Sequence, residues 1–593
     1  MKIFLKNKNE AIFECPENSQ LLLSAQDLVD GDKVRNVPQI IFPIKSLPKM
    51  AKVIREWWKV SSEDAIKAAM AVSNGVKERK RAIVEIRGEY EGDIKFHGDY
   101  KVRGIYPALK HQIVMFNAIV RLGGAAIIAE PGTCKTGAYL WGADYRIQSQ
   151  QVKKCLVITL SHLKENVLAE MQVQTPHLRG IVLGEKIQAD KIINQSYKVA
   201  KKNKEYDIYI ANYESMFSLV DIIPEDYFQM VVLDEAHRIG SPRSRQTKRI
   251  VNKFEYVPYK YIVTGTLNAN SPMSFYMPFR FLGPDMVHEA NFYEFQRRHF
   301  YTVDPDQHIW VPSPGTHQHV QEIIGNASVC FKKEDCLDLP PKVYETLKCD
   351  MSAAQAEEYR RTEEEMMFII KKACQDCPKN GTKCDWVCNN AILIKNVLVK
   401  NTKKAQITCG FFIDTKFEIT PEGKKIDRST IHWFDENPKL DLLISDLNNV
   451  PRDRKVIIWS IYTAGIKAIA DRLKKAFGED SYITVFGNDD AFAKVNEFRD
   501  NPKIRFFVAN QKKAGTGLNI QFSCYQKFFA NDHSYVIRGQ AEDRQHRKGQ
   551  KDVVTITDFA CRKTIDERIL NIINVEKKEM DNSLNSIARV AGL

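Results

Sequence analysis

The sequence predicts an α/β protein with two lobes, each built on a parallel β-sheet. Short apolar segments alternate with longer helical patterns in two separate parts of the chain. This alternation is typical of parallel strands that helices cover on both faces. The first set of predicted strands comprises 125–129, 155–159, 207–211, 230–233 and 261–264. The second set comprises 456–459, 483–486, 506–509, 528–530 and 554–558.

Three further regions complete the predicted organisation. Apolar segments at 20–24 and 82–86 predict strands and the pattern at 64–73 predicts a helix, so we expect a small α+β domain at the N-terminus. A mostly helical stretch at 286–450 interrupts the alternation, and a charged helix follows Thr564. The expected domains are an accessory domain at 1–105, a first lobe at 106–285, a helical connection at 286–330, a second lobe with a helical insertion at 331–562 and a helical brace at 563–593.

Composition narrows the class of protein. With 593 residues the chain has room for several domains. The 87 Lys and Arg residues exceed the 74 Asp and Glu residues, which gives a net charge of +13 and suits a polyanionic partner. No apolar segment approaches the ~18 residues that a membrane helix needs. Because the 13 cysteines are an odd number and mostly scattered, we expect a reducing cytosol or nucleus rather than secretion.

A phosphate-binding loop is predicted after the strand at 125–129. The residues that follow, Glu-Pro-Gly-Thr-Cys-Lys-Thr, lead into a helix whose first N–H groups can face an anion. Lys135 is expected to neutralise the β- and γ-phosphates of ATP, and the Thr136 hydroxyl to bind Mg²⁺. Gly132 and Thr133 supply the turn, but Cys134 stands where the strict pattern has glycine. The alternative is a strand–turn–helix without a ligand.

Two carboxylates end the apolar strand at 230–233. Asp234 at the carboxyl edge of a parallel sheet suits Mg²⁺, which takes one or two carboxylates together with phosphates and waters. Glu235 is then placed to orient or deprotonate an attacking water. The alternative is an ordinary capped strand end. The phosphate loop in the same lobe favours the catalytic interpretation.

A second half-site is predicted near the C-terminal end. Arg544 and Arg547 are three residues apart and share a face if the segment is helical. Guanidinium groups suit phosphate oxygens, and an arginine finger can raise the rate of phosphoryl transfer by ~10³–10⁵. Gly515 and Gly517 offer backbone that can approach phosphate. We therefore expect one nucleotide bound between two lobes; the alternative for the arginines is surface ion pairing.

Four cysteines form a cluster in the helical insertion. Cys374, Cys377, Cys384 and Cys388 have the short spacings that structural Zn²⁺ sites use. We expect an inserted zinc knuckle that holds a loop. The alternative is a loop with free thiols.

Residues 106–580 resemble a known family, the Swi/Snf-type DNA translocases within the superfamily-two helicase-like ATPases. The match rests above all on Gln-Ala-x-x-Arg-x-x-Arg-x-Gly-Gln at 540–550, Gly-x-Gly-Leu-Asn at 515–519 and Asp-Glu-Ala-His at 234–237. Other matching stretches are 109–112, 157–161, 210–214, 264–270, 339–342, 406–412, 455–460, 564–567 and Lys577.

The resemblance implies RecA-like lobes and further site residues. Gln112 would contact adenine, since its amide offers both a donor and an acceptor. The hydroxyl and amide groups expected to face the DNA backbone are those of Ser161, Asn212, Tyr213, Thr264 and Ser460. The cysteine cluster is not part of the family pattern.

We expect an ATP-dependent translocase on double-stranded DNA that remodels DNA or protein–DNA complexes. The alternatives are a strand-separating helicase and a DNA scaffold that binds ATP but hardly hydrolyses it. The expected partner is double-stranded or forked DNA and not a membrane, and the expected location is a bacterial, phage or viral cytoplasmic setting or a nucleus.

Overall fold

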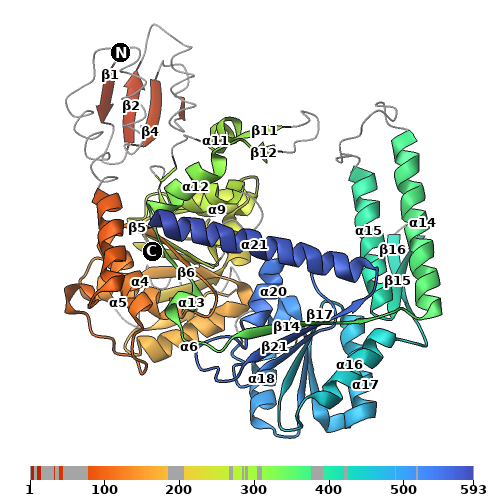
Figure 1. The fold of residues 1–593 in the computed structure, drawn as a ribbon. Helices are drawn as coiled ribbons and strands as arrows, with labels where there is room; N and C mark the ends of the chain where they lie inside the picture. The colour runs from red at the N-terminus through yellow and green to blue at the C-terminus, as the bar shows by residue number, and fades with distance from the viewer. Residues whose placement is uncertain are drawn as a thin grey trace. The chain divides into compact units, whose positions relative to one another are not determined.

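The computed structural model divides the chain into two units, which are described separately. One unit comprises Met1–Cys336 with Met580–Leu593, and the other comprises Leu337–Glu579 (Figure 1). The structure describes four strands within the first 43 residues and then 78–184, 206–265, 272–283, 286–287, 291–302, 310–375, 391–419, 425–487, 489–515 and 518–591.

The first unit contains a seven-stranded parallel sheet in the order β13-β5-β10-β9-β6-β8-β7. Its strands are β5 (Gly124–Ala129), β6 (Cys155–Thr159), β7 (Gly180–Val182), β8 (Ile208–Asn212), β9 (Met230–Asp234), β10 (Tyr259–Thr264) and β13 (Ser328–Phe331). The five predicted strands are confirmed. The short strands β7 and β13 were not predicted, and β13 extends this sheet into the stretch expected to be a helical connection.

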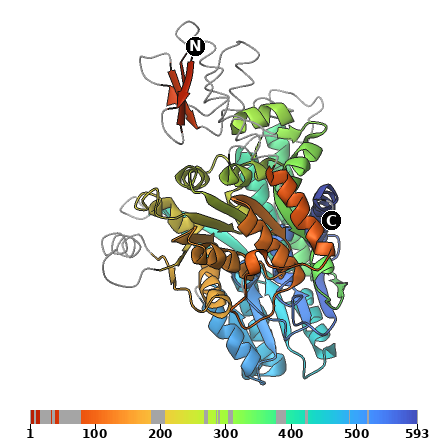
Figure 2. The ribbon, with the colours of Figure 1, turned by 90° about the vertical axis from the view of Figure 1, so that its left-hand side faces the viewer.

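Helices cover both faces of this sheet, as Figures 1 and 2 show. One face packs against α8 (Tyr213–Leu219), α9 (Arg245–Lys253), α10 (Tyr276–Leu282) and α12 (Thr316–Gly325). The other packs against α4 (Lys110–Arg121), α5 (Lys135–Gln148) and α6 (Lys164–Gln174).

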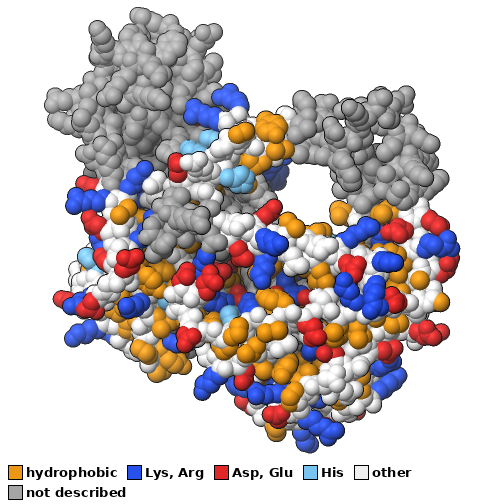
Figure 3. Space-filling model, in the orientation of Figure 1, with side chains coloured by type: hydrophobic (Ala, Val, Ile, Leu, Met, Phe, Trp, Pro, Cys, Tyr) orange, Lys and Arg blue, Asp and Glu red, His pale blue; other side chains and the backbone are white. Residues whose placement is uncertain are grey.

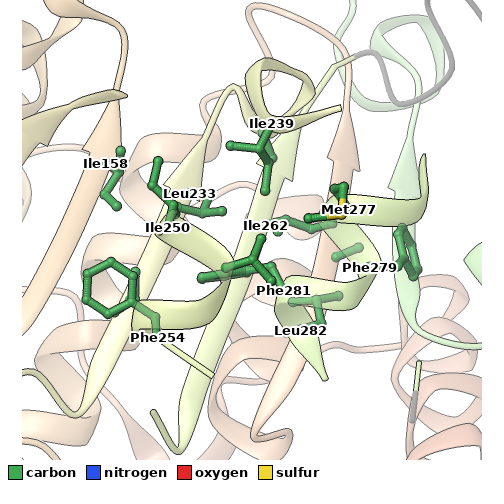
Figure 4. Close-up of a cluster of buried hydrophobic side chains, with 14 of the residues drawn as sticks. Ile158, Leu233, Ile239, Ile250, Phe254, Ile262, Met277, Phe279, Phe281 and Leu282 are labelled. Atoms are coloured by element: carbon green, nitrogen blue, oxygen red, sulfur yellow. The ribbon is translucent and has the colours of Figure 1, made fainter. Parts of the chain in front are cut away.

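Successive side chains of each strand point to opposite faces of the sheet, and this alternation builds the two cores. Ile158 and Ile262 point to the first face, where they pack with Ile250 of α9 and with Phe254 directly after that helix (Figure 4). Val157 and its neighbours on adjacent strands point to the second face. Each fully buried aliphatic side chain contributes about 1.5–3 kcal/mol. This construction fixes the carboxyl edge of the sheet, where the loops that follow β5, β6, β8, β9 and β10 lie together.

Residues 78–88 form a helix, so the predicted strand at 82–86 is wrong. Ile83 and Ile86 are buried in the second core, whereas Val84 between them is 65% exposed. That spacing follows the helical period, which a five-residue apolar segment could not distinguish from a strand. Residues 78–88 thus pack with the first sheet, although the predicted boundary separates them from it.

The remaining elements of the first unit are short. An antiparallel sheet at the N-terminus has the order β1-β2-β4-β3, with β1 (Lys2–Leu5), β2 (Glu10–Glu14), β3 (Asp32–Lys33) and β4 (Gln39–Pro43). The predicted strand at 20–24 and helix at 64–73 lie outside the described residues. The unit also contains α11 (Phe292–His299), the hairpin of β11 (Phe300–Thr302) and β12 (Trp310–Pro312), and α13 (Lys333–Cys336).

The second unit contains a six-stranded parallel sheet in the order β14-β21-β20-β17-β19-β18. Its strands are β14 (Lys342–Cys349), β17 (Val456–Ser460), β18 (Tyr482–Val485), β19 (Phe506–Asn510), β20 (Tyr525–Phe528) and β21 (Val554–Cys561). Strand β20 ends where the predicted strand at 528–530 begins, and β14 was not predicted. The two-lobed parallel α/β fold, with RecA-like lobes, is confirmed.

Helices again cover both faces of the second sheet. They are α16 (Pro438–Asn449) and α17 (Thr463–Phe477) on one face, and α18 (Ala491–Asp500), α19 (Gln511–Ala514) and α20 (Tyr535–Glu542) on the other. The insertion contains the long helices α14 (Ala353–Gln375) and α15 (Ala391–Thr408). It also contains a hairpin of β15 (Phe411–Ile419) and β16 (Lys425–Trp433), so this region is less purely helical than predicted.

The predicted C-terminal helix is confirmed as α21 (Ile565–Ala591). Among the described helices, none combines the length and apolar character needed to cross a bilayer.

Candidate active site

The phosphate loop joins β5 to α5. It turns sharply at Gly132, whose φ is 89°, and at Cys134, whose φ is 59°. The Thr133 hydroxyl closes the turn by donating to the Glu130 carbonyl at 2.8 Å. Helix α5 then begins at Lys135, so its first N–H groups face the carboxyl edge of the sheet.

Cys134 adopts a left-handed conformation that normally favours glycine. A non-glycine residue in this region costs about 1–2 kcal/mol. The loop therefore keeps the backbone path of a phosphate loop although the sequence lacks the expected glycine. The thiol is partly exposed, and its Sγ lies 3.8 Å from the Gly132 carbonyl.

Two side chains of helix α4 donate hydrogen bonds to carbonyl groups of the phosphate loop. The Gln112 amide donates to the Cys134 carbonyl at 2.9 Å and accepts from the Leu109 N–H at 3.0 Å. His111 Nε2 donates to the Thr133 carbonyl at 2.9 Å. Both ends of the Gln112 amide thus have protein partners here, and the side chain is 4% exposed. This geometry gives Gln112 and His111 a role in holding the loop.

Lys135 and Asp234 form the charged centre of this half-site. The Lys135 ammonium donates to the Ala129 carbonyl at 2.6 Å. Burial, and secondarily the charge of Glu235, raise the pKa of Asp234 to about 6, while Lys135 acts in the opposite direction. A buried carboxylate with a raised pKa is a site where a cation would be stabilised.

Neighbouring strand ends hold Asp234 in place. Its Oδ2 accepts from the Thr159 hydroxyl at 3.1 Å, and its Oδ1 accepts from the Glu235 N–H at 3.1 Å. The Tyr213 hydroxyl donates to the Asp234 carbonyl at 2.7 Å. No role for Thr159 was predicted from the sequence, because the pairing of β6 with β9 that brings it to Asp234 is a property of the folded sheet.

Glu235 begins a short polar chain that runs from the loop after β9 to the end of β10. Its φ is 52°, and its Oε2 lies 3.3 Å from His237 Nδ1. The same ring nitrogen lies 3.5 Å from the Thr264 hydroxyl at the end of β10. His237 thereby links the candidate base to β10, a role that was not predicted from the sequence.

The residues expected to face DNA differ in exposure. Ser161 is exposed at the start of a 3-10 turn (Ser161–Leu163). Asn212 is buried and donates to Glu214 Oε2 at 2.9 Å. The side chains of Tyr213, Thr264 and Ser460 have protein contacts, and these residues are 1%, 1% and 0% exposed. Tyr213 therefore positions Asp234 here rather than presenting a ring to solvent.

Surface charge does not by itself mark a DNA track on the face drawn in Figure 3. Among the described residues on that face, Lys and Arg lie interspersed with Asp and Glu. The net positive charge is therefore spread over this view.

The second half-site lies in the turn that follows α20. Helix α20 ends at Glu542, so Arg544 and Arg547 lie beyond it and the condition under which they would share a helical face is not met. The two side chains nevertheless converge. Their Nη1 atoms lie 3.4 Å and 3.3 Å from the carbonyl of Leu518. Arg547 also donates to the Asn519 side chain.

The glycine-rich loop and the arginines thus belong to one arrangement within the second unit. The Ile520 N–H donates to the Arg544 carbonyl at 3.1 Å. A Cβ on Gly515 would lie 2.1 Å from the Gln511 carbonyl oxygen, so only glycine fits there. Gly517 lies outside the described residues.

The zinc prediction is not tested. Cys377, Cys384 and Cys388 lie outside the described residues, and the Cys374 side chain near the end of α14 is not described. Among the side chains that are described, no group of three His, Cys, Asp or Glu could hold a metal ion.

Comparisons with known proteins found a family model, relatives and solved structures that are similar to this chain. A family model described as "SNF2-related domain" matches residues 54–407. TATA-binding protein-associated factor 172 of Homo sapiens is 22% identical over 438 residues, which cover 65% of this chain and 22% of that protein. A probable chromatin-remodeling complex ATPase chain of Oryza sativa subsp. japonica is 24% identical over 422 residues, which cover 68% and 34%.

A third relative, the SWI/SNF chromatin-remodeling complex subunit snf22 of Schizosaccharomyces pombe, is 22% identical over 492 residues, which cover 80% of this chain and 27% of that protein. The chain thus spans about a fifth to a third of the length of these relatives. A solved Sulfolobus solfataricus SWI2/SNF2 ATPase core in complex with dsDNA aligns with 84% of this chain and 97% of its own, at 18% identity and a TM-score of 0.37.

Proposed function

Because the chain belongs to the SNF2-related family, we propose that it is a DNA-dependent ATPase that moves along double-stranded DNA and remodels DNA or protein–DNA complexes. The observation that carries this proposal is the phosphate half-site. The phosphate loop leads into α5 through Cys134, whose backbone is left-handed. The ammonium of Lys135 lies close enough to Asp234 to lower the pKa of that carboxyl group.

The first half-site suits ATP with Mg²⁺. Thr136 and Asp234 offer the hard oxygen ligands that Mg²⁺ prefers, and the buried, pKa-raised carboxylate of Asp234 fits a nearby cation. Mg²⁺ would neutralise charge on the β- and γ-phosphates. Lys135 would leave the Ala129 carbonyl to reach the same phosphates, and the loop from Gly132 to Thr136 would supply N–H donors.

Glu235 is the proposed base or water-orienting group. Its contact with His237 fixes the carboxylate, and Thr264 links that contact to the strand β10. Arg544 and Arg547 would supply positive charge to the transition state from the second unit. Hydrolysis would then depend on how the two units are arranged, as in known hinge switches. Gln112 would contact adenine after rotating away from Cys134.

An ATPase assay on three DNA forms tests this proposal. We expect phosphate release that rises with duplex DNA and is lost in Lys135→Ala, because the β- and γ-phosphates then lack their cation. Single-stranded and forked DNA serve as comparisons. DNA-independent hydrolysis by the unaltered protein would reject the dependence on DNA. Undetectable hydrolysis would reject the ATPase proposal and favour an ATP-binding scaffold.

Movement and strand separation need their own measurements. Displacement of a triplex-forming strand from duplex DNA reports movement along the duplex, whereas displacement of a labelled strand from a fork reports unwinding. We expect the first and not the second. Unwinding of the fork would identify a strand-separating helicase.

Two further proposals extend this function. We propose that Cys374, Cys377, Cys384 and Cys388 hold one structural Zn²⁺. Metal analysis of the purified protein should then find one zinc per chain. We also propose a location where DNA is accessible, either a bacterial, phage or viral cytoplasmic setting or a nucleus.

A further inference from the structure

The arginine turn is defined as residues 540–550, and it contains a buried carboxylate near its start, that of Glu542. Glu542 ends α20, and its side chain is 2% exposed. It accepts from Arg538 Nε at 2.8 Å, from Lys342 Nζ at 3.2 Å and from the Tyr344 hydroxyl at 2.8 Å. Burial would raise the pKa of Glu542, but Lys342 and Arg538 hold it below its usual value, so the carboxylate is ionised.

Two of these partners lie beside a connection between the units. The chain leaves the first unit after Cys336, and the second unit begins with 337–341, directly before Lys342. Lys342 also contacts Asp543 Oδ1 at 3.1 Å. In the same segment, the Pro340 carbonyl accepts from His546 Nε2 at 2.8 Å. The segment 340–342 therefore holds the arginine turn on both sides of Arg544.

The second connection runs along α21, where the chain passes from one unit to the other after Glu579. Glu576 Oε2 accepts from the Tyr535 N–H at 2.7 Å, at the start of α20. Lys577 Nζ lies 3.1 Å from the Tyr344 hydroxyl and 4.3 Å from the centre of its ring. The first connection thus contacts Glu542 through Lys342. The second contacts the start of α20 through Glu576, and through Lys577 it contacts Tyr344, a partner of Glu542. Strand β14 and helices α20 and α21 are labelled in Figure 1.

We propose that Lys342 and Glu542 are positioning residues that couple both connections between the units to the arginine turn. A change in either connection would then shift Glu542, and with it the guanidinium groups of Arg544 and Arg547. The coupling is strong because, without Lys342, Glu542 must share Arg538 with Asp558. The buried negative charge is then only partly compensated, and we expect the turn to move so that water can reach it. This inference rests on the proposed function, since it concerns the hydrolysis of ATP.

Lys342→Met in the full chain tests the coupling. We expect the kcat of DNA-stimulated hydrolysis to fall about 10- to 100-fold, because misplaced catalytic groups lose transition-state stabilisation. The KM for ATP should change less than twofold, since the phosphate loop lies in the first unit. Lys342→Arg should restore most of the rate by keeping the charge.

Lys348→Met is the matched control. Lys348 lies on the same strand and pairs with Glu567 at 2.7 Å, but their side chains are 45% and 31% exposed. An exposed pair contributes little, so kcat should remain within twofold. Unaltered kcat in Lys342→Met, or an equal loss in Lys348→Met, would overturn the inference.

Hydrogen exchange separates this inference from the ATPase proposal. In Lys342→Met, the amides of Arg544 and Ile520 should exchange at least tenfold faster, because the turn that orders them has lost its anchor. Should Lys342→Met fail to fold, the near-isosteric Glu542→Gln gives the same comparison. Unchanged exchange rejects the coupling even if the protein hydrolyses ATP. Faster exchange supports it even if hydrolysis is absent, in which case only the ATPase proposal fails.

Discussion

The two half-sites are built in different ways. In the first unit, the proposed catalytic side chains lie at or just after the ends of parallel strands, and hydrogen bonds such as Thr159 to Asp234 join neighbouring strand ends. In the second unit, the arginine turn depends on a buried ionic network around Arg538 and Glu542. The first half-site is thus preorganised by the sheet, whereas the second can respond to charges on other elements.

The largest expected effect comes from the second half-site. Arg547→Ala should lower the kcat for ATP hydrolysis by about 10³-fold or more, because an arginine finger acts on the transition state. The dissociation constant for ATP should change only a few-fold, since the first unit provides the phosphate loop. Single-turnover hydrolysis and equilibrium binding measure the two quantities.

Arg499→Ala serves as the control for that experiment. Arg499 pairs with Asp500 on an exposed part of α18, where we expect no role in hydrolysis. Equal losses of ATP binding and of kcat in Arg547→Ala would show that the arginine contributes ground-state affinity instead.

Glu235→Gln should have the next largest effect. Removal of a general base lowers kcat by about 10²–10⁴-fold, while ATP binding persists because Lys135 is intact. The amide keeps the size of the side chain and can still contact His237. Steady-state hydrolysis at saturating DNA measures the effect, with Glu214→Gln as the exposed control carboxylate. Normal turnover in Glu235→Gln would assign water activation to another group.

Much of the first half-site could be predicted from the sequence. Asp234 and Lys135 follow apolar strands, and parallel topology brings such strand ends together. His237 and Thr159 could not be assigned, because their roles depend on which strands are neighbours in the sheet. Cys134 departs from the glycine of the strict phosphate-loop pattern, yet the backbone adopts the left-handed conformation with a cysteine present.

The second half-site was less predictable. A shared face for Arg544 and Arg547 was predicted only if their segment is helical, but α20 ends two residues before Arg544, and the arginines meet at the Leu518 carbonyl instead. Lys342 and Glu542 are 200 residues apart, so no local pattern indicates their ion pair. Strand and helix patterns are local, whereas this network depends on tertiary packing.

A stability measurement sharpens the comparison between the half-sites. Arg538 is 2% exposed and binds both oxygens of Asp558 as well as Glu542. Arg538→Met should lower the free energy of unfolding of the second unit by about 3–5 kcal/mol, because two buried carboxylates lose their partner. Denaturant unfolding measures this loss. The exposed pair of Arg454 with Asp552 is the control, for which Arg454→Met should cost less than about 1 kcal/mol.

The smallest expected effect concerns backbone strain in the first half-site. Cys134→Gly should raise the stability of the first unit by about 0.5–1 kcal/mol. Relief of the left-handed strain, about 1–2 kcal/mol, exceeds the greater conformational freedom of glycine in the unfolded chain, about 0.5–1 kcal/mol. Hydrolysis should be retained, since the N–H donors are unchanged. Gly132→Ala, at φ 89°, should shift the unfolding midpoint in the opposite direction. A destabilised Cys134→Gly would mean that the thiol contributes contacts that outweigh the strain.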